Sequence, residues 1–329
     1  MKTQKYLCTL AFAIGWVVAA IPAGAAPVLA APYDTSYSIF NLNSVPGVPG
    51  PYGGLTLEQG DPNTLLIGGD ANNQAGAIYS IGVTRDASGH ISGFSGTATP
   101  FASAPHIDGG LAYGPSGVLF YTAYPNNQVG EIKPGSTSPD KVIDLTPLGI
   151  VSSVGTLAFV PAGQPGAGGF KIASFTGGQF YNATLSPDGS GTYNITSATQ
   201  TAVVPTGEPE GIGYVPTGSP LFSQPSLLLS EFRGDVGAYT LDPDGNPIVS
   251  SRKDFITGLV GAQGAFIDPL TGDALFSTFG GGGVLNQIIE VRGFAAVVPE
   301  PSTLVMGSIA GLVGLAVVGR RAGQRASNS

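Results

Sequence analysis

The sequence predicts an all-β domain, a β-propeller of five four-stranded blades, between two apolar terminal segments. Three observations predict it. The 329 residues include 51 Gly and 27 Pro, which suit turns and break helices. A pattern of Gly, apolar strand, Pro/Gly turn and apolar strand recurs five times along the chain. A spare strand near the N-terminus completes the last repeat, which would close the ring of a propeller.

The N-terminal segment has the order of an export signal. Two lysines precede the apolar run YLCTLAFAIGWVVAAI, and small residues then offer cleavage after Ala25 or Ala30. Residues 1–30 are therefore interpreted as a signal peptide with a helical apolar core, and a retained N-terminal anchor helix is the alternative. Cys8 is the only cysteine and lies inside this segment. The exported domain would then contain no disulfide and no thiolate metal site.

The repeats account for the central part of the chain, residues 33–294. Equivalent glycines are spaced by 56, 45, 56 and 53 residues, at Gly54, Gly110, Gly155, Gly211 and Gly264. Each glycine begins a pair of apolar strands, followed by a third strand such as GDVGAYTLD and a fourth such as TYNITSATQTAV. The fifth repeat lacks a fourth strand, and TSYSIFNL, before the first repeat, is the spare one. Four strands per repeat predict propeller blades.

Two other architectures are compatible with the sequence. Six blades are the first alternative, because the longer repeats carry loops that could hide strands. A β-sandwich, or two small β domains, is the second. The longest Pro/Gly stretches, PAGQPGAGG and PTGSPLFSQP, fall between first and second strands of a repeat. They are therefore interpreted as loops and not as a domain boundary.

The central part is acidic. Residues 33–298 hold 20 Asp and Glu against 8 Lys and Arg, which gives a net charge of −12. This charge argues against nucleic acid as a partner and against direct attraction to anionic lipid. It is compatible with cation binding, and the simpler interpretation is that it keeps the protein soluble.

The C-terminal segment, residues 295–329, contains a candidate transmembrane helix. No charge occurs from Pro301 to Gly319, and residues 303–319 would form a helix of about 25 Å, at the short end for a membrane span. Arg320, Arg321 and Arg325 follow at once. Arginines at this place favour the cytoplasmic side, so the central domain would face outward.

The same segment resembles the PEP-CTERM sorting signal of Gram-negative bacteria. The resemblance rests on VPEPST, an apolar helix and a basic end in that order at the C-terminus, with a signal peptide at the other end. It assigns the motif to Pro299, Glu300 and Pro301. It implies Sec export, an inner-membrane-anchored intermediate, processing by an exosortase, and delivery to the outer envelope, cell surface or extracellular matrix, in a setting of exopolysaccharide and biofilm production. An ordinary C-terminal membrane anchor is the alternative.

Candidate ligand-binding residues precede the repeat glycines. In a propeller the inner strands surround a channel, so these residues would form a ring at one mouth. The ring comprises Tyr52, His106, Asp108, Ser153, Glu208, Glu210 and Gln263. The three acidic residues offer oxygen ligands suited to Ca²⁺ or another divalent cation, and His106 would suit a transition metal. The alternative is that these side chains satisfy strand ends and line a watery channel.

The repeat pattern is similar to propellers of the NHL and SMP-30 type. That resemblance implies a divalent metal at the channel mouth in the lactonases of this group, and it extends to Asp108, Glu210 and Gln263 here. No nucleophile motif accompanies them, so no catalytic residue is predicted. The sequence favours an exported binding or scaffolding protein, with matrix polysaccharide or another surface protein as partner. A metal-dependent hydrolase or lactonase, and a purely structural matrix protein, are the alternatives.

Overall fold

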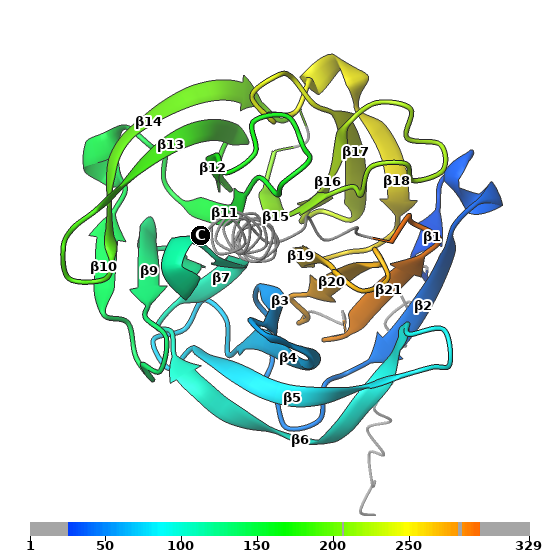
Figure 1. The fold of residues 1–329 in the computed structure, drawn as a ribbon, viewed down its shortest axis with the longest axis horizontal. Coiled ribbons are helices and arrows are strands. Elements are labelled where there is room, and N and C mark those ends of the chain that lie inside the picture. The colour runs from blue at the N-terminus through cyan, green and yellow to red at the C-terminus, as the bar shows by residue number, and fades with distance from the viewer. Residues whose placement is uncertain (1–25, 206, 282–284, 297–329) are drawn as a thin grey trace, which may run out of the picture.

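The computed structural model describes residues 26–205, 207–281 and 285–296, and these form a five-bladed β-propeller (Figure 1). Apart from four short 3₁₀ turns, the described residues with regular structure are in strands. None of the helices among them is long and apolar enough to cross a membrane. The predicted signal helix and the predicted transmembrane helix at 303–319 lie outside the described residues.

The first three blades each contain four antiparallel strands. The first has β3 (Leu55–Glu58), β4 (Asp61–Gly69), β5 (Ala77–Arg85) and β6 (Ile91–Ser103). The second has β7 (Ile107–Tyr113), β8 (Leu119–Ala123), β9 (Gln128–Ile132) and β10 (Lys141–Asp144). The third has β11 (Val154–Phe159), β12 (Phe170–Ser174), β13 (Gln179–Pro187) and β14 (Tyr193–Val203). In each blade the strands follow one another from the axis outward, as the repeats predict.

The fourth and fifth blades both include strands from the N-terminal region. The fourth has β15 (Pro209–Tyr214), β16 (Ser226–Glu231), β17 (Asp235–Thr240) and β18 (Lys253–Thr257), with β1 (Val28–Leu29) paired to β18. The fifth has β19 (Ala262–Ile267), β20 (Ala274–Thr278), β21 (Ile288–Arg292) and β2 (Ser38–Asn43). Pairing of β2 with β21 confirms the predicted ring closure. Five blades are confirmed and six are excluded, whereas β1 was not predicted as a strand.

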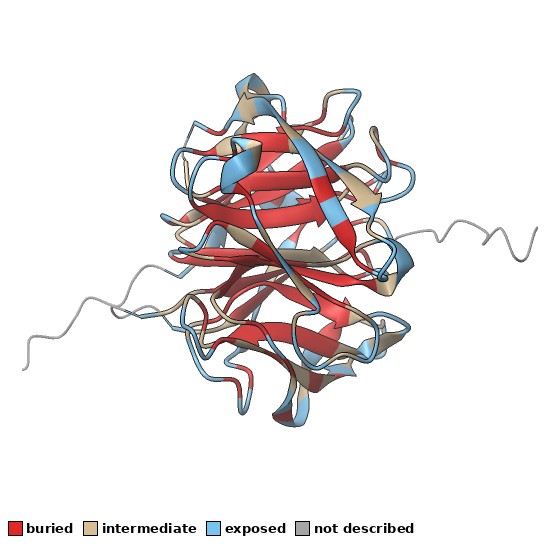
Figure 2. Ribbon diagram, turned by 90° about the vertical axis from the view of Figure 1, so that its left-hand side faces the viewer, coloured by how far each residue is buried: buried red, intermediate tan, exposed pale blue. Residues whose placement is uncertain are grey.

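Buried residues run along the strands of the blades (Figure 2), and the buried apolar residues form clusters that join neighbouring sheets. Between the fourth and fifth blades, for example, Leu228 and Phe255 belong to the same buried cluster as Phe276. Buried apolar area of this kind stabilises a fold by about 25 cal/mol per Å². The described residues include no cysteine. The propeller is therefore held together by apolar packing between neighbouring blades, repeated around the ring, and not by disulfides.

The two ends of the axis differ. We call the end where the inner strands β3, β7, β11, β15 and β19 begin the entry face, and the end where they finish the exit face. Val28 pairs with Thr257 at the entry face, so the described chain begins there. It ends at the exit face, where the Ala295 N–H donates to the Ser219 hydroxyl at 3.1 Å.

Candidate functional site

Three of the predicted residues meet on the propeller axis, next to the entry face. Gln263 Nε2 donates to Asp108 Oδ1 at 2.6 Å and to Glu210 Oε2 at 3.4 Å. Asp108 lies in the second blade, Glu210 in the fourth and Gln263 in the fifth, so these contacts cross the channel. We call these three side chains the axial cluster.

The repeat glycines allow the inner strands to approach so closely. A β-carbon on Gly211 would lie 2.5 Å from the Gln263 carbonyl oxygen, and one on Gly155 would lie 2.2 Å from that of Pro209. Any larger residue would push the strands apart. The Gly-rich start of each repeat thus follows from a narrow five-bladed ring, in which backbone packs against backbone.

The axial cluster is sealed from solvent. Asp108 and Gln263 are 0% exposed and Glu210 is 2% exposed. Burial raises the pKa of the Asp108 carboxyl well above its ordinary value. Burial, and then the charge of Asp108, raise the pKa of Glu210 in the same direction. Since neither carboxylate has a salt-bridge partner among the described residues, the pair favours holding a proton or binding a cation near neutral pH.

Three oxygen atoms in and beside the axial cluster are unpaired. Asp108 Oδ2, Gln263 Oε1 and Asn72 Oδ1 are buried without a hydrogen-bond partner in the described part of the chain. The Asn72 side chain lies close enough to Asp108 to lower the pKa of that carboxyl, against the larger effect of burial. Carboxylate and amide oxygens are the ligands that Ca²⁺ prefers. The described residues contain no group of three or more His, Cys, Asp and Glu side chains placed to hold a metal, so a cation here would depend on the amides as well.

Asn72 was missed in the sequence. It lies in the turn after β4, in the run GGDANN, and has a φ of 65°. Asn is favoured at such positions, so the sequence signals a turn there. Nothing in the sequence indicates that this turn points toward the axis.

The structure places His106 and Glu208 beside the cluster and not in it. His106 Nε2 lies 3.0 Å from Gln74 Oε1, and Nδ1 lies 3.3 Å from the Asn72 carbonyl oxygen. Glu208 Oε1 accepts hydrogen bonds from Arg233 Nε at 2.8 Å and from Nη2 at 2.6 Å. Both candidate ligands are thus engaged by neighbouring loops.

Tyr52 and Ser153 have structural contacts. The Tyr52 hydroxyl accepts from the Val45 N–H at 2.8 Å, and the ring belongs to a buried apolar cluster. The Ser153 carbonyl accepts from the Ser174 hydroxyl at 3.2 Å. These contacts place Tyr52 in the core and hold the Ser153 backbone next to the start of β11.

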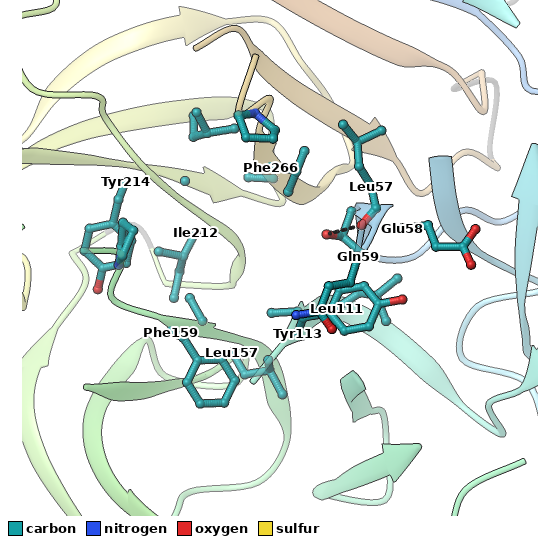
Figure 3. A pocket seen from close by; sticks show the side chains of 18 of the residues that line it. Leu57, Glu58, Gln59, Leu111, Tyr113, Leu157, Phe159, Ile212, Tyr214 and Phe266 are labelled. Atoms are coloured by element: carbon teal, nitrogen blue, oxygen red, sulfur yellow. Dashed lines mark hydrogen bonds between the residues drawn. The ribbon is translucent and has the colours of Figure 1, made fainter. Parts of the chain in front are cut away.

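A cavity of about 480 Å³ opens on the other side of the cluster, toward the exit face (Figure 3). Gly109 contributes to its floor, and every inner strand contributes to its wall. The wall is mainly apolar and includes Leu57, Leu111, Leu157, Ile212 and Phe266, with the aromatic rings of Tyr113, Phe159 and Tyr214. Glu58, Gln59 and Asp61 lie at its margin. This volume and lining are typical of sites for small ligands.

Comparisons with known proteins find propellers and no family. No family model matches the chain, and no curated protein matches it. Among solved structures, a luciferin-regenerating enzyme is 12% identical over 85% of this chain and 95% of its own, with a TM-score of 0.43. The PQQ-bound aldose sugar dehydrogenase of Streptomyces coelicolor is 14% identical over 76% and 83%, with a TM-score of 0.39. The Cps50 (Swd1) β-propeller domain of Myceliophteria thermophila is 9% identical over 75% and 70%, with a TM-score of 0.38. Likenesses this distant carry no argument about activity.

Proposed function

We propose that this protein is an exported binding or scaffolding propeller of the bacterial envelope, which binds a small, mainly apolar ligand in the cavity at its exit face. The observation that supports binding over catalysis is the arrangement along the axis. A general acid or base must come within about 3 Å of the group that it serves. The carboxylates of the axial cluster lie sealed beneath the cavity floor, whereas the cavity wall is mainly apolar and its carboxylates, Glu58 and Asp61, lie only at the margin.

The C-terminal segment supports the envelope location. The C-terminal order of motif, apolar run and arginines is the reason for proposing membrane insertion and processing by an exosortase at Pro299–Pro301. The surrounding matrix would then be exopolysaccharide. The described chain ends at the exit face, and residues 297–302 span at most about 20 Å when extended. A protein inserted through residues 303–319 would hold its cavity toward the membrane, and this placement suits an apolar ligand.

Filling the cavity tests the proposed function. Gly213 lines it, and a β-carbon there would meet only side chains, the nearest being Ile267 Cδ1 at 3.3 Å. We expect Gly213→Val to weaken binding of a fluorescent fatty-acid probe at least tenfold, measured by titration of the chain from residue 26 to residue 296, which contains all strands of the five blades. Gly82→Val is the matched control, since Gly82 lies in β5 away from the cavity. A probe that binds all three proteins equally, or none, would contradict the proposal.

A bound divalent cation is a second candidate, favoured by the unpaired oxygens around Asp108. This candidate predicts that elemental mass spectrometry of the same chain would find one divalent ion, lost in both Asp108→Asn and Glu210→Gln. Such an ion would be a reason to screen the protein for metal-dependent hydrolase activity. If the parent chain holds none after purification in Ca²⁺, the carboxylate pair holds a proton instead and the cation site is wrong.

A further inference from the structure

Four aromatic residues occupy one position in four blades at the entry face. Tyr124, Phe175, Phe232 and Phe279 each follow directly after the second strand of a blade, β8, β12, β16 and β20. The local sequences are TAY, ASF, SEF and STF, and the first blade has GGD, which places Asp70 at the fifth position. All four residues are half-buried. We call the four rings the aromatic collar.

The collar is evenly spaced around the axis. Successive ring centroids lie 5.6, 5.6 and 5.7 Å apart, and successive planes are inclined by 72°, 78° and 69°. Five positions at this spacing surround the axis at about 5 Å, within the roughly 6 Å over which a cation is attracted to an aromatic ring. A group on the axis would therefore be in reach of all four rings.

The collar lies directly outside the axial cluster. The N–H of Tyr124 donates to the His106 carbonyl at 3.0 Å, and that of Phe232 donates to the Glu208 carbonyl at 3.1 Å. His106 and Glu208 each precede a cluster carboxylate by two residues, so these bonds connect the collar to the starts of the inner strands that carry the cluster. The fully buried Asp108, with Oδ2 unpaired, thus lies beneath the collar.

The charges around the collar at the entry face favour binding of a cation. Asp70 completes the circle of aromatic residues, and its Oδ1 accepts from Asn73 Nδ2 at 2.8 Å. The exposed Arg233 is paired with Glu208, so these two charges offset each other. Aromatic rings present a negative face, and a ring of them with a carboxylate suits an alkylated ammonium group, which is large, weakly hydrated and positive.

We propose that the aromatic collar, with Asp70, binds an organic cation, of the alkylammonium class, at the entry face. This site is independent of the apolar cavity at the exit face. The same chemistry does not suit a phosphate or another anion, because carboxylates lie at and below the collar. A neutral sugar, which also stacks on aromatic rings, is the competing occupant that the experiment separates.

Choline tests the proposal against its neutral isostere, 3,3-dimethylbutan-1-ol. We expect choline to bind the chain from residue 26 to residue 296, with an upfield ring-current shift of its methyl protons in NMR titrations. Phe232→Leu and Asp70→Asn should each weaken binding roughly 3- to 30-fold. Phe40→Leu is the matched control, because Phe40 is an exposed ring on β2, away from the collar.

Three outcomes would overturn the cation site. The first is no choline shift at tens of millimolar, and the second is an equal shift with the neutral isostere. The third is binding of a neutral glucan oligosaccharide in place of choline, which would assign the collar to sugars. The comparison of choline with its isostere uses the unmodified chain, so it decides the matter even if a collar variant folds poorly.

Discussion

Thr122 and Ser277 have equivalent positions in the second and fifth blades. Each connects its own blade to the following one. The Thr122 hydroxyl accepts from the Gly110 N–H at 2.9 Å and donates to the Gly155 carbonyl at 2.9 Å. Ser277 makes the same two contacts, at 2.9 and 2.6 Å, between the fifth and the first blade. These buried hydroxyls satisfy backbone groups where the inner strands meet, and the contact through Ser277 closes the ring.

Removing the Ser277 hydroxyl should therefore weaken the whole fold. Ser277→Ala leaves a buried N–H and a buried carbonyl without that partner, so we expect the free energy of unfolding to fall by about 1–3 kcal/mol in urea titrations. Ser230 is the matched control, since it has the same position in the fourth blade but its hydroxyl has no hydrogen-bond partner among the residues that the structure describes. Ser230→Ala should change stability by less than about 0.5 kcal/mol. Equal losses in the two variants would show that the contact is not what stabilises the ring.

At the scale of elements, the N-terminal strands contribute unequally. β2 pairs with β21 along Ser38 to Asn43 and supplies the outer strand of the fifth blade. β1 adds two residues to the outside of β18, and Val28 is largely exposed. Closure of the ring therefore depends on β2, whereas β1 extends a blade that is already complete.

Truncations should separate these two roles. A chain that begins at Ala31 loses β1 and is expected to unfold within about 5 °C of the chain that begins at Ala26. A chain that begins at Ser44 loses β2 as well, exposes the edge of β21, and should show no cooperative thermal transition or a tendency to aggregate. Circular dichroism on heating measures both. A cooperative transition in the shorter chain would mean that the ring closes without β2.

The sequence predicts correctly those positions on the propeller axis that are fixed by the spacing of the repeats. Asp108, Glu210 and Gln263 precede repeat glycines, so the fivefold register was enough to bring them to one axis. His106 and Glu208 share that register, but φ values of 62° and 57° turn the chain locally, and loop contacts then engage their side chains. Positions of this kind depend on tertiary contacts and carry no repeat signal. β2 was predicted because a blade lacked a strand, and β1 was not because no blade required it.

At the scale of the whole molecule, the pKa values of buried and of surface carboxyl groups are shifted in opposite directions. Burial raises the pKa of Glu131 and of Glu290 to about 7, in addition to raising those of the axial cluster. On the surface, hydrogen bonds from backbone N–H groups lower the pKa of carboxylates such as Asp144. The two sets have opposite effects on how stability depends on pH.

The sign follows from linkage between protonation and folding. A carboxylate with a raised pKa binds its proton more tightly in the folded chain, so its contribution is complete below its unfolded pKa, near 4.5, and is lost as pH rises through about 7. A carboxylate with a lowered pKa contributes above its unfolded pKa, near 3.8, and loses that contribution only as pH falls below it. Among the carboxylates, only the buried set titrates between pH 5 and pH 8. Stability should therefore be highest near pH 5 and decrease toward pH 8.

Urea midpoints at pH 5.5, 7.0 and 8.0 measure this trend for the chain from residue 26 to residue 296. We expect the midpoint to fall steadily with rising pH, and Glu131→Gln to reduce the slope, because the neutral amide keeps an acceptor for the Tyr193 N–H and has no proton to lose. Asp144→Asn, on the adjacent strand β10, is the control and should leave the slope unchanged in this range. A midpoint that rises with pH would mean that these buried carboxylates are ionised in the folded protein, with a bound cation as the physical reason to seek first at Asp108 and Glu210.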